Sequence, residues 1–304
     1  MSMEPSTSRN FGSPKQISIG VVISVAALVA IGIAALWPSR AREIHSPRSS
    51  CAANLRGIAQ SMNIYAADNA DQYPIVPFAA YRSDMNAPRG VSTGTNDSEA
   101  ALRALFSDGK QAGSVEACMW MLVLSGQVSP KQFVCPEDRF ADRAAIATTD
   151  ARGNYFDGFQ NPKQLSYSMA YPWSGDGKPG PWWKNTTDAA FPIFADMAPK
   201  QGTGKPARSL TPSKAPADAR AWNSGNHGGE GQIVAFGDGH AEWFKSPDVG
   251  FGNDNIYSMS GDPSKGPAQF GGIPAGAAAP NLRAEKPLYD IIMLPVRDET
   301  TGKL

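Results

Sequence analysis

Residues 232–244 read QIVAFGDGHAEWF and predict a β-hairpin. Two runs of alternating apolar residues flank Asp238-Gly239, a pair typical of a two-residue type I′ turn in which both residues adopt a positive φ. In the register that this turn sets, Phe236 lies opposite Ala241 and Val234 lies opposite Trp243. Residues paired across antiparallel strands share a face, so we expect these four side chains to form the core side of a sheet.

The rest of the chain supplies further strands and short helices. Residues 115–124 follow Ser114, a favourable N-cap, and 98–106 predict another short helix. Brief apolar runs bounded by turn formers predict strands at 133–136, 165–171, 191–195 and 288–296. The segments 200–220 and 262–281, rich in Gly, Pro and Ala or Ser, predict loops. Together these elements predict an α+β fold with an antiparallel sheet and long loops.

Residues 51–70 predict a longer amphipathic helix, capped by Ser49 or Ser50. Its apolar side chains recur every three or four residues and form one stripe: Leu55, Ile58, Met62 and Tyr65. Such a stripe is stable only when it is buried against another element. We therefore expect this helix to pack on the sheet.

Residues 17–37, ISIGVVISVAALVAIGIAALW, contain no charged side chain. A helix of this length spans roughly 30 Å, the thickness of the hydrocarbon core of a bilayer. Trp37 suits the membrane interface and Pro38 ends the apolar helix. We therefore expect a retained, single-pass anchor that carries an exported domain. The alternative is a cleaved secretory signal with its cleavage site at 39–41, although signal h-regions are usually about 7–15 residues long.

Composition adds few constraints on function. The 304 residues include 28 basic and 28 acidic side chains, so no net charge marks the chain for nucleic acid. No motif identifies a small-molecule substrate. The pattern predicts a disordered N-terminal segment (1–16), the anchor (17–37), a hinge (38–48), an α+β ectodomain (49–260), and a Gly/Pro/Ala-rich segment with a final strand and tail (261–304).

The three cysteines, Cys51, Cys118 and Cys135, leave at least one thiol unpaired within a single chain. In an exported domain, a bridge between Cys118 and Cys135 would close a modest loop. Three buried thiols are the alternative interpretation.

His227, Asp238 and His240 are the only close cluster of His and Asp in the sequence. They could bind Zn²⁺ or Mn²⁺, or act as an acid–base pair with Asp196. We favour a structural role, in which Asp238 suits the turn, His227 hydrogen-bonds the adjoining loop and His240 faces solvent. No HExxH, GxSxG or phosphate-binding loop is present. We therefore expect no catalytic residue, no metal and no cofactor.

Trp173, Trp182 and Trp183 lie near Tyr171 in a Gly/Pro-rich segment. They could form an aromatic surface for sugars or peptides. Aromatic side chains that anchor the loop in the core are the favoured explanation.

Residues 223–257, NSGNHGGEGQIVAFGDGHAEWFKSPDVGFGNDNIY, resemble the C-terminal signature of bacterial pilin-like proteins with a prepilin-processing-associated His-x9-Asp-Gly motif. Here ten residues separate the histidine from the aspartate, and shorter segments across 49–260 resemble the same family. The chain lacks the Gly-Phe peptidase site and the early Glu usual in prepilins. In this chain the motif that the resemblance marks as structural comprises His227, Asp238, Gly239 and His240.

The resemblance implies a pilin-like fold, in which a transmembrane and amphipathic N-terminal helix packs on an antiparallel sheet. It further implies a non-enzymatic structural protein of a type II secretion or type IV pilus-like system. Its partners would be the inner membrane and other pilin-like subunits or secretion-machinery proteins, with the ectodomain periplasmic or extracellular. The alternative function is a membrane-tethered ectodomain that binds or processes carbohydrate.

Overall fold

The computed structural model describes residues 47–78, 90–107, 114–144, 146–174, 177–199, 223–251, 255–259, 268–270, 291–298 and 301–303. Within these ranges, none of the helices combines the length and the apolar character needed to cross a bilayer. The predicted anchor (17–37), the N-terminal segment (1–16) and the predicted loop 200–220 lie outside the described residues.

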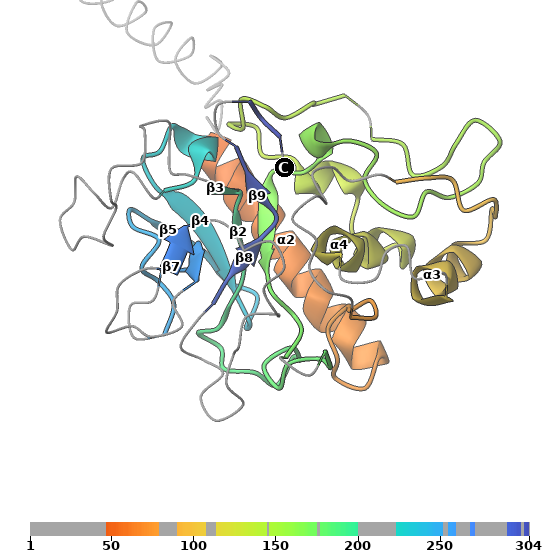
Figure 1. The fold of residues 1–304 in the computed structure, drawn as a ribbon, viewed down its shortest axis with the longest axis horizontal. Helices are drawn as coiled ribbons and strands as arrows, with labels where there is room; N and C mark the ends of the chain where they lie inside the picture. Colours follow the sequence, from red (N-terminus) through yellow and green to blue (C-terminus); the bar gives the residue numbers. More distant parts are fainter. Residues whose placement is uncertain are drawn as a thin grey trace, which may run out of the picture. The chain divides into compact units, whose positions relative to one another are not determined.

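The predicted antiparallel sheet is confirmed, and the described part of the chain is an α+β fold (Figure 1). Five strands lie in the order β5-β4-β2-β1-β8, with antiparallel pairing throughout. Their bounds are β1 Tyr167–Ala170, β2 Pro192–Asp196, β4 Gln232–Phe236, β5 Ala241–Phe244 and β8 Met293–Leu294. Strands β1, β2 and β4 are buried along their whole length, so the core lies on both faces of the sheet centre.

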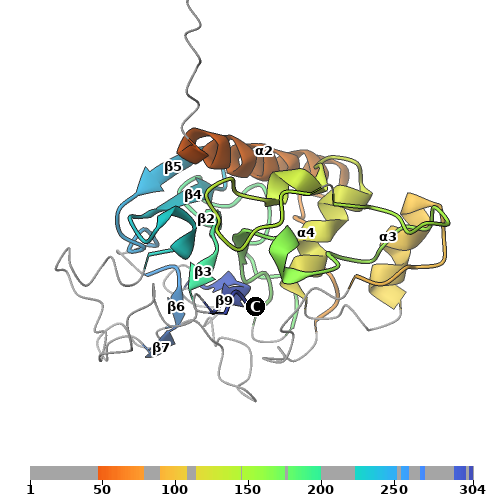
Figure 2. The same cartoon turned by 90° about the horizontal axis from the view of Figure 1, so that it is seen from above.

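The amphipathic helix is confirmed as α2, Pro47–Asp68, which lies along one face of the sheet and contacts β2, β4 and β5 (Figure 2). All four residues of the predicted apolar stripe are buried. The predicted cap at Ser49 or Ser50 is wrong, because α2 already begins at Pro47, inside the predicted hinge. Proline suits the first turn of a helix, where its missing N–H has no intrahelical partner to lose.

The two short helices are also confirmed, as α3, Ser98–Ser107, and α4, Val115–Leu124. Ser114 caps α4, since its Oγ accepts a hydrogen bond of 3.0 Å from the N–H of Ala117. The strand predicted at 133–136 is wrong. Phe133 instead ends a 3₁₀ helix, η1 Pro130–Phe133, whose start is fixed by the capping box of Ser129 and Gln132. A second 3₁₀ turn, η2 Pro162–Gln164, precedes β1.

The hairpin of β4 and β5 exists, but its predicted register is wrong by one residue. The turn has three residues, since the N–H of Phe236 donates to the carbonyl of His240 (3.0 Å) and Gly239 alone takes the positive φ, 87°. Ile233 therefore pairs with Trp243, and Val234 with Glu242. A slip of one residue moves side chains to the other face, so the four expected core residues do not share a face.

The last predicted strand, 288–296, is divided in the structure. Its described part forms β8, which pairs with β1, and β9 Val296–Arg297, which runs parallel to β3 Ala198–Pro199. A further pair joins β6 Ser258–Met259 to β7 Ala268–Phe270. Strands from the predicted C-terminal segment, 261–304, therefore belong to the same sheets as strands of the preceding ectodomain.

The aromatic loop is anchored in the core. Trp173, Trp182 and Trp183 are each at most 3% exposed, and Tyr171 is 2% exposed. The indole N–H groups donate to buried carbonyls, from Trp173 to Val76 at 3.0 Å and from Trp183 to Pro74 at 2.9 Å. These rings offer no open face to a sugar, as the favoured interpretation expected.

Candidate functional site: a buried disulfide, histidine and carboxylate cluster

The segment Cys135–Asp138, which follows η1, contacts three distant parts of the chain. Cys135 forms a disulfide with Cys51 in the first turns of α2, 84 residues earlier. Glu137 contacts His227 through its carboxylate. Asp138 binds Arg297 of β9. We call Cys135–Asp138 the clamp segment.

The predicted bridge between Cys118 and Cys135 is therefore wrong. Cys118 is a free, fully buried thiol on α4. Its sulfur accepts from the N–H of Val76 and lies 3.4 Å from the carbonyl oxygen of Ser114, and burial raises the pKa of the thiol to about 12. The pairing depends on the tertiary contact between α2 and η1, which sequence spacing does not encode.

His227 ends the short helix η4, Gly225–His227, which residues 228–231 separate from β4, and its side chain is fully buried. Asp196 ends β2, the neighbour of β4 in the sheet. The antiparallel pairing brings His227 Nε2 to 2.9 Å from Asp196 Oδ2. This pair was one hypothesis from the sequence, and the structure places the two residues in contact.

Asp196 is also fully buried, and backbone and amide donors satisfy its remaining oxygen positions. The N–H of Ile233 donates to Oδ2 at 2.7 Å, and Asn226 Nδ2 donates to Oδ1 at 3.0 Å. Buried carboxylates are stable when they are hydrogen-bonded and paired in this way.

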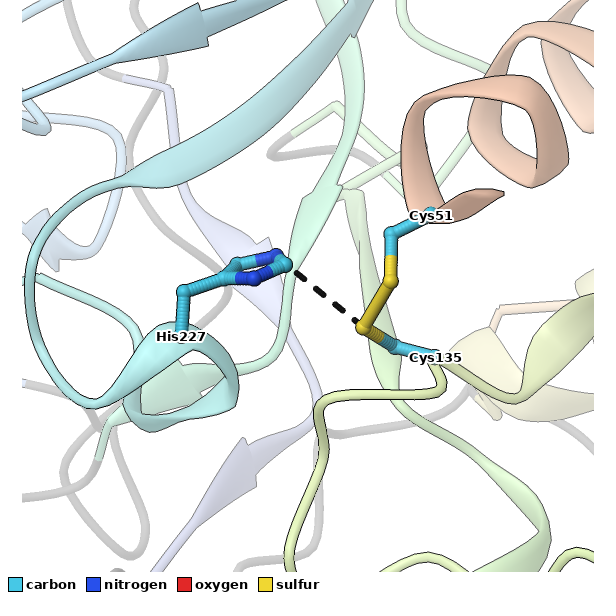
Figure 3. A group of neighbouring side chains, drawn as sticks. All are labelled: Cys51, Cys135 and His227. Carbon is cyan, nitrogen blue, oxygen red and sulfur yellow. Dashed lines mark hydrogen bonds between the residues drawn. A yellow bond between two sulfur atoms is a disulfide. The ribbon is translucent and has the colours of Figure 1, made fainter. Parts of the chain in front are cut away.

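The disulfide between Cys51 and Cys135 lies beside the imidazole ring of His227 (Figure 3). Nε2 of His227 is 3.9 Å from Cys135 Sγ, while Nδ1 contacts the carboxylate of Glu137. The ring packs edge-on against Trp243 of β5, with centroids 5.1 Å apart. Both ring nitrogens thus have carboxylate partners, so neither is free to take a proton from a substrate. The arrangement suits a buried cross-link better than a general base.

Burial by itself lowers the pKa of His227, but the carboxylates of Asp196 and Glu137 more than offset this effect, and the pKa is raised above 6.5. The folded chain therefore holds the proton more tightly than the unfolded chain. The contribution of protonated His227 to the free energy of unfolding is therefore fully present below pH 6.5 and is lost as pH rises through the raised pKa.

Urea unfolding at pH values on both sides of 6.5 measures this effect. We expect the free energy of unfolding to fall with rising pH in the wild type and in His240→Asn, whose histidine is exposed at the hairpin tip. His227→Asn should lack this component of the fall. An equal pH dependence in all three proteins would contradict the assignment.

The remaining motif residues lie at the opposite end of β4, which spans roughly 16 Å for its five residues. His240 Nδ1 is 2.5 Å from Asp238 Oδ1, and both side chains are about half exposed. The structure thus does not bring His240 and Asp238 to His227, and the three-residue metal or catalytic cluster that was the alternative interpretation is not formed.

The hairpin turn instead packs against α2. Asn63 Nδ2 donates to the carbonyl of Gly237 at 3.1 Å, and a side chain at Gly239 would meet Gln60 Cγ at 3.2 Å. Tyr73 adds a second hydrogen bond to the same carbonyl. Gly239 therefore has two reasons to be glycine, its positive φ and the close helix.

The ion pair between Asp138 and Arg297 was not predicted from the sequence. Arg297 is 1% exposed and its Nη1 lies 2.6 Å and 2.7 Å from the two carboxylate oxygens of Asp138. Its Nη2 donates to the carbonyl of Leu165, and Ser166 Oγ donates to Asp138. The partners are 159 residues apart, and no local pattern links them.

A cavity of about 550 Å³ lies beside the disulfide. Residues that flank the two cysteines line it, namely Ser50, Val134 and Pro136, together with the charged side chains of Lys131 and Arg143.

Comparisons of the chain with protein-family models, with curated proteins and with solved structures each found no match.

Proposed function

We propose that this chain is a membrane-anchored, pilin-like structural protein that acts by assembly in a type II secretion or type IV pilus-like system. The observation that carries the proposal is the position of α2. It is a 22-residue helix laid along one face of an antiparallel sheet, and it follows the predicted anchor in sequence after the short segment 38–46. This is the arrangement that the resemblance to pilin-like proteins implies.

The attachment of α2 to the sheet supports a structural role. Near its N-terminal end, the Cys51–Cys135 disulfide joins the helix covalently to the clamp segment. In its second half, Asn63 holds the hairpin turn. Between these points the apolar stripe is buried. A helix fixed in this way is rigidly joined to the folded part of the chain that begins at Pro47, which we call the head. It would pass any constraint on its N-terminal end to the head.

The motif residues contribute to the same attachment under this proposal. His227 and Asp196 tie η4 and the end of β2 to the clamp segment, beside the disulfide. Gly239 and its neighbours in the hairpin turn contact α2 near Asn63. The motif thus has a physical role in holding helix, sheet and clamp segment together, without a catalytic step.

Fractionation of cells that express the full-length chain tests the anchor. We expect the protein to stay in membranes after alkaline extraction and to be released by detergent. Val25→Arg with Leu28→Arg should release it, because each arginine at the centre of a span costs about 2.5–3.5 kcal/mol of insertion free energy. The matched variant, Val25→Leu with Leu28→Val, should remain bound. Wild-type protein that is free in the soluble fraction would contradict the proposal.

Assembly is tested separately with photo-crosslinking side chains at Ile64 on α2 and Phe106 on α3, which are 57% and 45% exposed. We expect adducts with a second copy of the chain or with a pilin-like subunit, identified by mass spectrometry. The same positions in the Val25→Arg, Leu28→Arg variant should give none. The absence of such adducts from the anchored protein would exclude assembly through either surface.

A further inference from the structure

We propose that the dithiol form of this chain binds one Zn²⁺ ion between Cys51, Cys135 and His227, at the position that the disulfide occupies in the oxidised form. The proposal concerns the folded head alone and does not depend on the anchor or on assembly. Of the residues that the structure describes, these three form the one group of histidine, cysteine and acidic side chains that is arranged for a metal ion.

The ligand atoms are already close together. The two sulfurs and a ring nitrogen of His227 lie within 4.8 Å of one another, and all three residues are buried. Zinc bonds of about 2.3 Å to sulfur and about 2.0 Å to nitrogen require ligand atoms roughly 3.5 Å apart. The observed separation of 3.9 Å between Cys135 Sγ and His227 Nε2 is near this value. Once the covalent bond is broken, the two sulfurs must separate to make room for the ion.

Asp196 is the candidate for a fourth ligand, and Glu137 supplies an outer-shell contact. Asp196 Oδ2 lies 2.9 Å from the same Nε2 and can exchange its contact with the ring for a bond to the ion. Glu137 contacts the opposite nitrogen, Nδ1, of His227. A carboxylate on the second nitrogen of a ligating histidine is the usual outer partner in zinc sites, where it fixes the orientation of the ring.

The charges also favour a divalent cation once the disulfide is open. As ligands the two cysteines are thiolates, and with the carboxylate of Asp196 they carry negative charge that Zn²⁺ largely neutralises in the buried site. Thiolate and imidazole ligands select zinc over calcium or magnesium, which prefer oxygen. Two Cys and one His, completed to four ligands by Asp196, would make a closed donor set of the kind typical of structural zinc sites.

The conversion balances with a dithiol reductant as co-reactant. The reductant transfers two electrons and two protons to the Cys51–Cys135 bond and becomes a disulfide, leaving two thiols. Zinc binding then releases both thiol protons and the proton of the His227 imidazolium, so three protons leave the site. The reverse thiol–disulfide exchange with an oxidised dithiol, which takes up the two electrons and two protons and becomes a dithiol, restores the Cys51–Cys135 bond, removes two ligands and expels the ion. The two states exclude each other.

The experiment uses the full-length chain in detergent. One sample is reduced with a dithiol and freed of the reductant, and both the reduced and the oxidised protein are incubated with Zn²⁺. We expect the reduced protein to retain one equivalent of Zn²⁺ after gel filtration, and the oxidised protein to retain none. Substitution with Co²⁺ should give sulfur-to-cobalt charge-transfer absorption, whose intensity reports two thiolate ligands. Added Zn²⁺ should also raise the melting temperature of the reduced protein.

Matched variants locate the site. Cys118→Ala removes the free thiol on α4 and should leave zinc binding unchanged. Cys51→Ser, Cys135→Ser should abolish the charge-transfer absorption and the bound zinc, and His227→Asn should weaken affinity at least tenfold. Glu137→Gln should weaken it by about 10–100-fold, the usual effect of losing an outer-shell partner. The oxidised His227→Asn protein shows whether that variant folds.

Three results would overturn the proposal. One is a reduced wild-type protein that retains no zinc and gains no thermal stability from it, including the case in which reduction unfolds the chain and Zn²⁺ does not restore the fold. The second is equal binding by the Cys51→Ser, Cys135→Ser variant. The third is loss of binding in Cys118→Ala while the oxidised form of that variant remains folded.

Discussion

Replacing Cys51 and Cys135 together by alanine should lower the free energy of unfolding by about 4.5 kcal/mol, the value that loop-closure entropy gives for a bridge between residues 84 apart. The bridge limits the conformations of the unfolded chain, and the substitution removes this restriction. Urea unfolding of the oxidised, metal-free protein measures the effect, which should appear as a lower midpoint.

Two comparisons distinguish this effect from simple damage to the core. Wild-type protein treated with a reductant and a chelator should unfold at nearly the midpoint of the double variant. Cys118→Ala changes one buried thiol outside the bridge and should cost much less, about 1 kcal/mol. If peptide mapping instead finds Cys118 in the disulfide, or if reduction does not move the midpoint, the observed pairing would be contradicted.

Asp138→Ala should destabilise the protein by about 3–5 kcal/mol, because it leaves the buried guanidinium of Arg297 without its counter-ion. Hydrogen bonds from Ser166 and from the N–H of Phe140 to the carboxylate are lost at the same time. Removal of both charges, in Asp138→Ala with Arg297→Met, should recover part of the loss, since no unpaired charge then remains buried.

The exposed pair of Arg103 and Glu99 on α3 provides the control. Its nitrogen and oxygen are 3.5 Å apart, and both side chains are at least 70% exposed. Arg103→Ala should change the free energy of unfolding by less than about 0.5 kcal/mol, as is usual for exposed pairs on a helix. Similar effects of Asp138→Ala and Arg103→Ala in thermal or urea unfolding would show that the buried pair has no special weight.

Local patterns in the sequence predicted the elements whose cause is local. The stripe of α2 follows from helical periodicity, and the start of α4 follows from one serine whose hydroxyl caps the helix. The hairpin shows where local reasoning fails. Gly237-Asp238-Gly239 accommodates a two-residue or a three-residue turn, and packing of the turn against α2 accompanies the longer one. The register of every side chain in β5 depends on that choice.

The site was less predictable because its partners are distant in sequence. His227 was identified from its motif, and Asp196 was weighed as its partner, but Glu137 and the disulfide were not connected with them. Cys51, Cys135 and His227 meet only because α2, the clamp segment and the start of β4 pack at one end of the sheet. The contact of Asp138 with Arg297 likewise requires β9 to be in place. The spacing of these residues along the chain does not predict the contacts between them.

The position of the sulfur bridge determines how the head carries mechanical load. Tension applied along the chain from the N-terminal side would reach Cys51 and cross directly to Cys135, bypassing every residue between them. Force applied to the ends of the chain could extend those residues only after the disulfide is cleaved chemically. In a single-molecule stretching experiment, the oxidised head should therefore release a shorter contour length than the reduced head.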